Sequence, residues 1–218
     1  VDGARSVGFL AAVFERAGVP FHAWSVIKGI DPVAEARMAA AVLDAGALSL
    51  TLDLEPYEEF WNGTADDALR FGEELRARNE FGRVDISIDP RPWKLLEIPL
   101  REFVQFVDGI QPQLYWDLFD NEDNANAYAF MGYPPGPGGL TPEFLLEATH
   151  QLLSPYDRWL LPVGEGAPVY ADAWPRFAQR AWELQMPELA VWRYGLTTDA
   201  TMSYLAEHRA GSDPAAAA

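Results

Sequence analysis

The residues from Ala47 to Pro56 constrain the fold of this chain more than any other stretch. Leucines at alternate positions are separated by the polar residues Ser49, Thr51, Asp53 and Glu55. Because successive side chains of a β-strand point to opposite faces, the leucines share one face and the polar residues share the other. The run lies between two helix-like segments, where buried parallel strands are found. The pattern therefore predicts a strand that carries two carboxylates near its C-terminal end.

Helical and strand-like patterns alternate along the rest of the chain. Asp31 followed by Pro32 predicts a helix start, and so does Thr64 followed by acidic residues. We expect strands over 21–27, 47–56, 83–89, 109–116, 158–163 and 189–194, helices over 3–17, 32–45, 65–79, 99–107, 141–153, 172–185 and 198–209, and a long loop over 117–140. Strands separated by helices imply parallel pairing through right-handed crossovers.

This order of elements fits two parallel α/β folds, an open doubly wound sheet and a closed barrel. The central strands of an open sheet should be apolar on both faces, whereas several strands predicted here carry a polar face. A barrel with a polar lumen near its top accounts better for that pattern. We therefore expect one (β/α) TIM-type barrel domain over 1–210 and a flexible tail over 211–218. A complete barrel takes about 250 residues, so we expect a first strand upstream of Val1 or a reduced barrel.

Composition and charge limit the partners of such a domain. The 218 residues carry a formal net charge of −17, and the sequence contains no basic patch that could follow a phosphate backbone. We therefore expect neither a nucleic acid nor an anionic membrane surface as a partner. Cysteine is absent, which excludes disulfide and thiolate chemistry. A neutral or cationic ligand suits this charge best, and no pattern indicates an oligomeric state.

In a barrel, the polar faces of the strands would meet near their C-terminal ends. The side chains that this arrangement gathers are carboxylates, amides and aromatic rings. They are Trp24, Lys28, Asp53, Glu55, Asp89, Arg91, Gln113, Tyr115, Asp117, Glu165 and Trp192. Sugar binding uses this mixture, because aromatic faces stack on pyranose rings while amides and carboxylates hold hydroxyls. Trp61, beside Tyr57 and Phe60, either flanks a substrate groove or covers the barrel rim.

The pair of Asp53 and Glu55 suits glycosidic bond cleavage. This reaction needs a carboxylic acid that protonates the leaving oxygen and a second group that stabilises an oxocarbenium-like transition state. A glutamate beside an ionised aspartate in a partly dry lumen has its pKa raised by desolvation and by like-charge repulsion. Such a glutamate is a good general acid. We therefore predict that Glu55 is the acid and Asp53 its modulator.

Three short motifs resemble TIM-barrel glycosidases of the family 18 chitinase and family 25 lysozyme type. Asp53-Leu54-Glu55 resembles their D-x-E at a strand end. Gln113–Asp117 resembles a later strand of the chitinase-like enzymes, and Val191–Gly195 resembles their last strand. The resemblance implies a cofactor-free hydrolase of N-acetylated polysaccharides, such as peptidoglycan or chitin, with an extracellular or cell-envelope location. It also implies that Tyr115 positions the N-acetyl group and that Trp192 forms the floor of a sugar subsite.

Two other functions fit the same side chains. The carboxylates Asp53, Glu55, Asp89 and Asp117 offer the oxygen ligands that Mg²⁺ prefers, so a magnesium-dependent lyase or phosphodiesterase is one alternative. A catalytically silent barrel that binds glycans through its tryptophans is the other. The three histidines lack the spacing of metal ligands, so we expect no zinc site. For the preferred glycosidase, we expect a retaining, substrate-assisted route and no bound metal.

Overall fold

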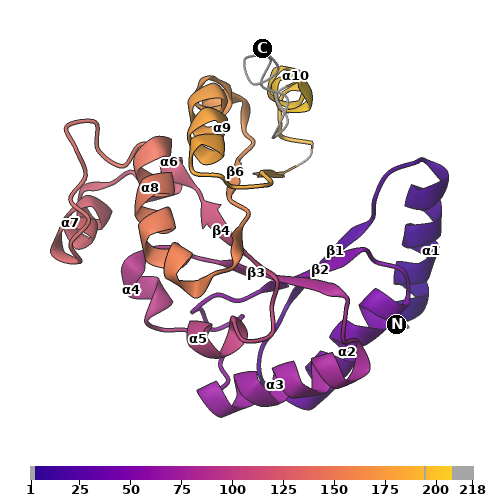
Figure 1. Cartoon of the computed structure of the whole chain (residues 1–218). Coiled ribbons are helices and arrows are strands. Elements are labelled where there is room, and N and C mark those ends of the chain that lie inside the picture. The colour runs from indigo at the N-terminus through magenta and orange to yellow at the C-terminus, as the bar shows by residue number, and fades with distance from the viewer. Residues whose placement is uncertain (1–2, 194, 208–218) are drawn as a thin grey trace. The chain divides into compact units, whose positions relative to one another are not determined.

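The computed structural model describes residues 3–193 and 195–207, which divide into two compact units (Figure 1). The first unit comprises residues 1–89 and 94–110, and the second comprises 90–93 and 111–218. The boundary falls within strand β4 (Gly109–Leu114) and within the short helix α4 (Pro92–Leu95). The predicted tail over 211–218 and the predicted domain end at residue 210 lie outside the described residues.

The first unit alternates helices with parallel strands. Its elements in chain order are α1 (Gly3–Arg16), β1 (His22–Val26), α2 (Pro32–Asp44), β2 (Ser49–Asp53), α3 (Ala65–Arg78), β3 (Arg83–Ile88), α5 (Leu100–Phe103) and the start of β4. Strand β2 pairs in parallel with β1 on one side and with β3 on the other. Helices α2 and α3 pack against each other and lie on one face of these strands (Figure 1).

The starts of α2 and α3 follow the local sequence. The Asp31 side chain accepts a hydrogen bond from the backbone N–H of Ala34 at 3.0 Å, and Pro32 occupies the first helical position. At α3, the Thr64 hydroxyl accepts from the N–H of Asp67, whose carboxylate accepts from the N–H of Thr64 at 2.9 Å. These bonds satisfy backbone donors that a helix start leaves without partners. Both predicted helix starts are confirmed.

Strand β2 separates two faces, and both are buried. Leu50 and Leu52 lie on the face toward the helices, whereas Thr51 and Asp53 lie on the other, where Asp53 is only 2% exposed. The alternation predicted from the sequence is therefore present within the strand. Leu48 departs from the prediction, because it precedes β2 and is 62% exposed.

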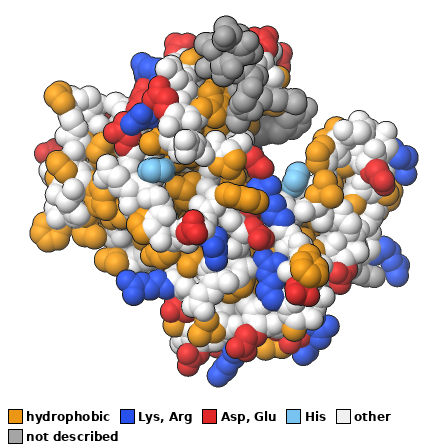
Figure 2. Space-filling view, viewed as in Figure 1, with side chains coloured by type: hydrophobic (Ala, Val, Ile, Leu, Met, Phe, Trp, Pro, Cys, Tyr) orange, Lys and Arg blue, Asp and Glu red, His pale blue; other side chains and the backbone are white. Residues whose placement is uncertain are grey.

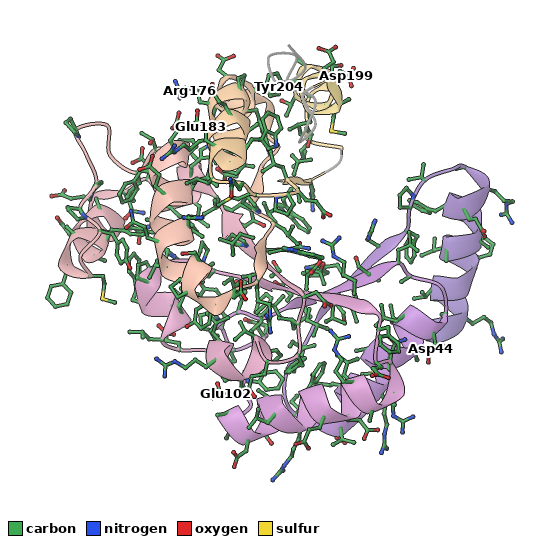
Figure 3. The ribbon with its side chains drawn as sticks, in the orientation of Figure 1. Asp44, Glu102, Arg176, Glu183, Asp199 and Tyr204 are labelled. Carbon is green, nitrogen blue, oxygen red and sulfur yellow. The ribbon has the colours of Figure 1, made fainter. Side chains whose placement is uncertain are left out.

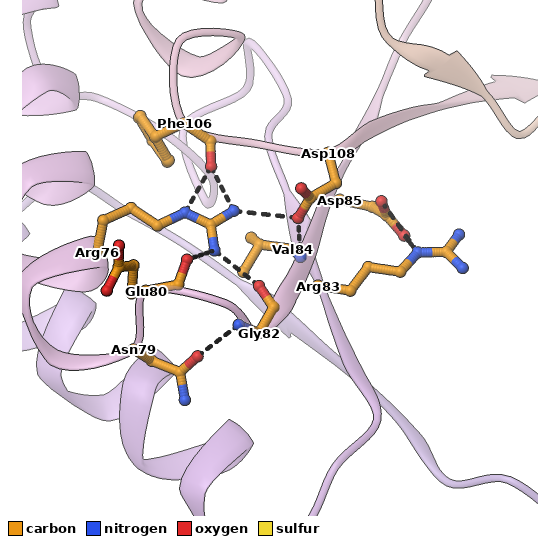
Figure 4. A network of polar contacts seen from close by, with 9 residues as sticks. All are labelled: Arg76, Asn79, Glu80, Gly82, Arg83, Val84, Asp85, Phe106 and Asp108. Atoms are coloured by element: carbon orange, nitrogen blue, oxygen red, sulfur yellow. Dashed lines mark hydrogen bonds and ion pairs between the residues drawn. The ribbon is translucent and has the colours of Figure 1, made fainter.

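An arginine of α3 connects several backbone segments of the first unit (Figure 4). The Arg76 guanidinium donates to the carbonyl oxygens of Phe106 and Gly82 at 2.8 and 2.7 Å. It also pairs with the Asp108 carboxylate at 3.0 Å, and the same carboxylate accepts from the N–H of Val84 at 2.8 Å. Arg76 therefore ties the C-terminal part of α3 to the N-terminal ends of β3 and β4.

The second unit has shorter strands and more aromatic packing. After β4 it contains α6 (Trp116–Phe119), α7 (Glu122–Phe130), α8 (Pro142–Leu153), the 3-10 turn η1 (Ser154–Tyr156), β5 (Trp159–Leu160), β6 (Val163–Glu165), the 3-10 segment η2 (Pro168–Ala173), α9 (Trp174–Glu183), β7 (Ala190–Trp192) and α10 (Asp199–Glu207). Strand β6 pairs in parallel with β4 and β7, and β5 pairs with β4. The rings of Trp116, Trp174 and Phe177 pack with centroids 5.1 to 5.9 Å apart.

The α/β class with parallel strands is confirmed in both units, whereas closure into a complete TIM-type barrel is not shown. Three element predictions need correction. The predicted loop over 117–140 contains α6 and α7, because Asn121 caps α7 by accepting from the N–H of Asn124 at 2.9 Å. The predicted helix over 99–107 is the four-residue α5, and the predicted strand over 158–163 is the two-residue β5.

The surface mixes charged and apolar side chains. Figure 2 shows acidic and basic groups interspersed with hydrophobic ones on the face in view. Ion pairs join oppositely charged neighbours on the helices, as between Arg176 of α9 and Glu143 of α8 at 2.7 Å. Among the helices that the structure describes, none combines the length and the hydropathy needed to cross a lipid bilayer.

Candidate functional site

In the first unit, polar side chains occupy one face of the sheet in successive rows. The register aligns His22 with Ser49 and Arg83, Trp24 with Thr51 and Asp85, and Val26 with Asp53 and Ser87. Paired residues of parallel strands project to the same face, so these rows form one continuous surface. Within it, the His22 Nδ1 atom lies 2.7 Å from the Ser49 hydroxyl. The polar face therefore runs across all three strands toward their C-terminal ends.

Asp53, Asp85 and Asp89 on this face are almost completely buried. Asp53 ends β2 and Asp89 follows β3, so both lie at the C-terminal ends of parallel strands. A buried carboxylate is costly unless polar partners compensate it. Asp85 pairs with the guanidinium of Arg83 at 3.1 Å, and Asp89 accepts a hydrogen bond from the Tyr57 hydroxyl at 2.8 Å. The partners of Asp85 and Asp89 therefore compensate part of the cost of burying these two acids.

Glu55 and Lys28 lie just beyond the ends of β2 and β1. The Glu55 side chain is half-buried, whereas Lys28 is exposed. The loop that carries Lys28 is held by Glu35 of α2, whose carboxylate accepts hydrogen bonds from the backbone N–H groups of residues 28–31 at 2.7 to 3.3 Å. Sequence reasoning missed Glu35, because its role depends on how the chain bends back into α2.

The tryptophans of the first unit have different environments. Trp24 is half exposed on β1, in the same row as Asp85. Trp61 is only 5% exposed and packs edge-on against Phe71 and Phe103, with ring centroids 6.3 and 5.0 Å away. Trp24 therefore keeps half of its surface exposed, whereas the surroundings of Trp61 are those of a core residue.

In the second unit, the candidate residues gather at the C-terminal ends of β4, β6 and β7. Tyr115 follows β4 and is half-buried, and Asp117 lies in α6 with an exposed side chain. Glu165 ends β6 and aligns in register with Trp192, which ends β7 and is 49% exposed. The backbone N–H of Asp117 donates to the Glu165 carboxylate at 2.9 Å. Asp117, Glu165 and Trp192 are therefore neighbours.

Glu165 has an unusual electrostatic environment for a carboxyl group. Its partial burial raises the pKa of its side chain above the ordinary value, and the nearby negative charge of Asp117 acts in the same direction. The hydrogen bond from the Asp117 backbone lowers the pKa of Glu165 and only partly offsets the burial. Carboxyl groups with raised pKa values are frequent in functional sites. From the sequence, Glu165 is predicted to be one of the polar groups at the strand ends, without a role of its own.

Arg91, a predicted substrate contact, belongs to the second unit and is half-buried. Its guanidinium carbon lies 4.7 Å from the ring centroid of Phe119 and 5.8 Å from that of Trp93. These distances are typical of cation–π contacts. The Trp93 ring in turn packs edge-on against Tyr128, at 5.2 Å. The Arg91 guanidinium therefore lies against two aromatic rings of the second unit.

The arrangement of acids bears on the magnesium hypothesis. Within the ranges 3–193 and 195–207, no group of three or more His, Asp or Glu side chains is arranged to hold a metal ion. Of the four proposed ligands, Asp53, Glu55 and Asp89 belong to the first unit and Asp117 to the second. Mg²⁺ often uses only one or two carboxylates together with substrate phosphates, so the magnesium-dependent alternative stays a prediction.

Each unit carries part of the predicted site. The predicted residues of the first unit are Trp24, Lys28, Asp53, Glu55, Trp61 and Asp89, and those of the second are Arg91, Gln113, Tyr115, Asp117 and Trp192. With Glu165 included, each unit combines carboxylates at strand ends with a half-exposed tryptophan. In comparisons with known proteins, neither a family model nor a curated protein sequence matches this chain.

Proposed function

We propose that the protein is a glycoside hydrolase that cleaves an N-acetylated polysaccharide such as peptidoglycan or chitin. The main support is the position of Asp53, a buried carboxylate at the C-terminal end of β2, with half-buried Glu55 two residues further on. Catalytic residues of (β/α)-barrel enzymes come from the C-terminal ends of strands.

In this proposal Glu55 is the general acid and Asp53 its modulator. Glu55 is partly accessible and can meet a glycosidic oxygen, whereas Asp53 is buried. An ionised Asp53 favours the protonated form of a neighbouring glutamate. In the substrate-assisted route, the acetamido oxygen of the sugar attacks the anomeric carbon while Glu55 protonates the leaving oxygen. That route needs one accessible acid and no carboxylate nucleophile.

The remaining residues serve substrate binding in this proposal. Tyr115 is the residue to which the resemblance gives the positioning of the acetamido group, and Trp24 and Trp192 each offer a half-exposed ring within their own unit. Trp61 is left out, because it packs within the aromatic core of the first unit. Closure of the parallel strands into a reduced TIM-type barrel is also part of the proposal.

The test is the release of reducing ends from chitin oligomers and from peptidoglycan by the purified protein. Glu55→Gln keeps the shape of the side chain but removes its proton, so we expect activity to fall by about 10²- to 10⁴-fold. Glu58→Gln is the matched control, since Glu58 is an exposed acid of the same loop. An inactive wild-type protein would contradict the proposed function, and an active Glu55→Gln variant would contradict the assignment of the acid.

A glycan-binding protein without catalytic activity is the second candidate. The half-exposed rings of Trp24 and Trp192 favour it, because ring stacking gives affinity without any need for acid catalysis. Binding of chitin oligomers without release of reducing ends, unchanged by Glu55→Gln, is the result that would select this candidate.

A further inference from the structure

The turn over residues 57–62 follows the end of β2 and is held together by the side chain of Asn62. The Asn62 amide donates one hydrogen bond to the carbonyl oxygen of Glu58 at 2.9 Å and another to that of Phe60 at 2.8 Å. The backbone N–H of Asn62 donates to the carbonyl oxygen of Lys28 at 2.9 Å. Asn62 thus closes this turn and connects it to the loop that follows β1.

The residue after Asn62 has to be glycine. A Cβ atom on Gly63 would lie 2.7 Å from the ring of Trp61, which packs against Phe71 and Phe103 and cannot move aside freely. Real Cβ atoms do not approach other atoms so closely, so no side chain fits at position 63. The fold of the first unit therefore keeps an Asn-Gly pair at the end of this turn.

An Asn-Gly pair can react within itself. The backbone nitrogen of the glycine attacks the side-chain Cγ of the asparagine, and a C–N bond forms. The Cγ–Nδ2 bond breaks, and ammonia leaves with the proton of the attacking N–H. Water then opens the cyclic succinimide at either carbonyl group, which leaves aspartate or isoaspartate. Glycine favours the attack because it has no side chain to hinder the approach.

We propose that Asn62 is a site of spontaneous deamidation and that its product releases the turn over 57–62. Among the residues that the structure describes, the Gly63 N–H donates to no acceptor, so the attacking nitrogen is not held in a hydrogen bond. Asn62 is exposed, which gives water access to the succinimide.

The product removes what holds the turn. A carboxylate at position 62 has no N–H to donate, and it places a negative charge against the carbonyl oxygens of Glu58 and Phe60. Both side-chain hydrogen bonds are therefore lost. The same turn carries Tyr57, whose hydroxyl donates to buried Asp89 on the polar face of the sheet. Deamidation of Asn62 thus loosens a segment that borders the candidate site of the first unit.

The other asparagines of the chain serve as internal comparisons, because each precedes a residue with a side chain, namely Glu80, Glu122, Ala125 and Ala127. The Asn79 amide donates to the carboxylate of Asp44 at the end of α2 (Figure 3), at 2.9 Å. The amides of Asn79 and Asn62 are thus both engaged in hydrogen bonds. A difference in their rates of deamidation therefore reports on the glycine that follows Asn62.

The first test is peptide mass spectrometry of the whole chain after incubation at pH 8, both folded and unfolded in urea. We expect Asn62 of the folded chain to convert several-fold faster than Asn79 and the remaining asparagines. Conversion should be faster still in urea, where Glu58 and Phe60 no longer hold the amide. A folded chain that keeps the Asn62 amide, or that loses it no faster than the Asn79 amide, would overturn the site.

The second test is hydrogen exchange in Asn62→Asp, which carries one of the two products. We expect the backbone amides of Phe60 and Asn62 to exchange roughly 10- to 100-fold faster, the effect of losing two hydrogen bonds. Asn126→Asp, at an exposed position of α7, is the matched control and should leave these amides unchanged. Wild-type exchange in folded Asn62→Asp would overturn the release of the turn. Neither measurement uses hydrolase activity, so the proposal is tested independently of the proposed function.

Discussion

The two units place carboxylates at equivalent ends of parallel strands but surround them differently. In the first unit, Asp85 pairs with Arg83 and Asp89 accepts from the Tyr57 hydroxyl. In the second unit, Glu165 accepts a backbone N–H and has its pKa raised, chiefly by burial. Asp85 and Asp89 are almost completely buried and have positive and hydroxyl partners, whereas half-buried Glu165 has neither kind of partner among the described residues. The partners of a carboxyl group, rather than its place at a strand end, therefore decide how strongly its charge is favoured.

The largest effect should come from Asp85 in the first unit. Asp85→Ala leaves the Arg83 guanidinium without its carboxylate and empties a buried polar position. Loss of one partner of a buried ion pair typically costs about 3–5 kcal/mol, and the partial exposure of Arg83 places our expectation near 3 kcal/mol. Urea denaturation measures this change in the free energy of unfolding. Glu73→Ala, on the exposed side of α3, should change it by less than about 0.5 kcal/mol.

A smaller loss is expected when the arginine that ties the strand ends together is removed. Arg76→Ala deletes charged hydrogen bonds to the carbonyl groups of Phe106 and Gly82 and the pairing with Asp108. We expect a loss of about 2–3 kcal/mol, in the upper part of the range for a hydrogen bond to a charged group, because several such bonds are lost together. Arg78→Ala is the matched control, because Arg78 pairs only at the surface with Glu74, and such pairs contribute below about 1 kcal/mol. Equal losses in the two variants would show that the network is not stabilising.

The helix caps of the two units can be compared in the same way, with a smaller expected effect on stability. Thr64 forms a reciprocal capping box with Asp67 in the first unit. In the second unit, Thr141 caps α8 through one bond from the Phe144 N–H, at 3.2 Å. Substitution of a cap residue by alanine costs about 1 kcal/mol on average. We expect Thr64→Ala to exceed that value and Thr141→Ala to fall below it in urea denaturation, and the reverse order would reject this ranking.

The features that could be predicted from the sequence are those with local causes. The starts of α2 and α3 follow from Asp31 and Thr64, whose partners lie three residues away. The two faces of β2 follow from the alternation of the strand. Strand β6 escaped prediction, because three residues give no readable period and the strand is defined by its pairing with β4 and β7.

The environments of the site residues depend on contacts with residues that lie far away in the sequence. From the sequence, Trp61 is expected in a loop at a groove or a rim. In the structure, the rings of Phe71 and Phe103 pack against it. Glu165 owes its raised pKa to burial and to Asp117, which lies 48 residues earlier in the chain. Periodicity identifies a side chain's face but not what covers that face. The glycines around Glu165 were the one local signal, since a glycine in a strand indicates a close approach of the backbone.

The smallest predicted effect is a dependence of stability on pH, with opposite signs for two glutamates of the second unit. The folded-state pKa of Glu165 is raised above its ordinary value of 4.5. The stability that this group contributes is therefore fully present below pH 4.5 and is lost as the pH rises through the raised pKa. Glu165→Gln stays neutral and keeps an acceptor for the Asp117 N–H. We expect this variant to match wild type at pH 4 and to be more stable at pH 8.

Glu183 provides the contrast, because its hydrogen bond to Arg180 lowers the pKa of its carboxyl group. The stability from Glu183 is present above the ordinary pKa and is lost as the pH falls through the lowered one. Glu183→Gln should therefore be less stable than wild type at pH 8, with the difference shrinking toward acid. Urea denaturation of both variants between pH 3 and 8 measures how the free energy of unfolding of each changes with pH. If the Glu165→Gln curve runs parallel to that of wild type, Glu165 is solvated like an ordinary surface acid, and the contrast between its environment and the paired carboxylates of the first unit disappears.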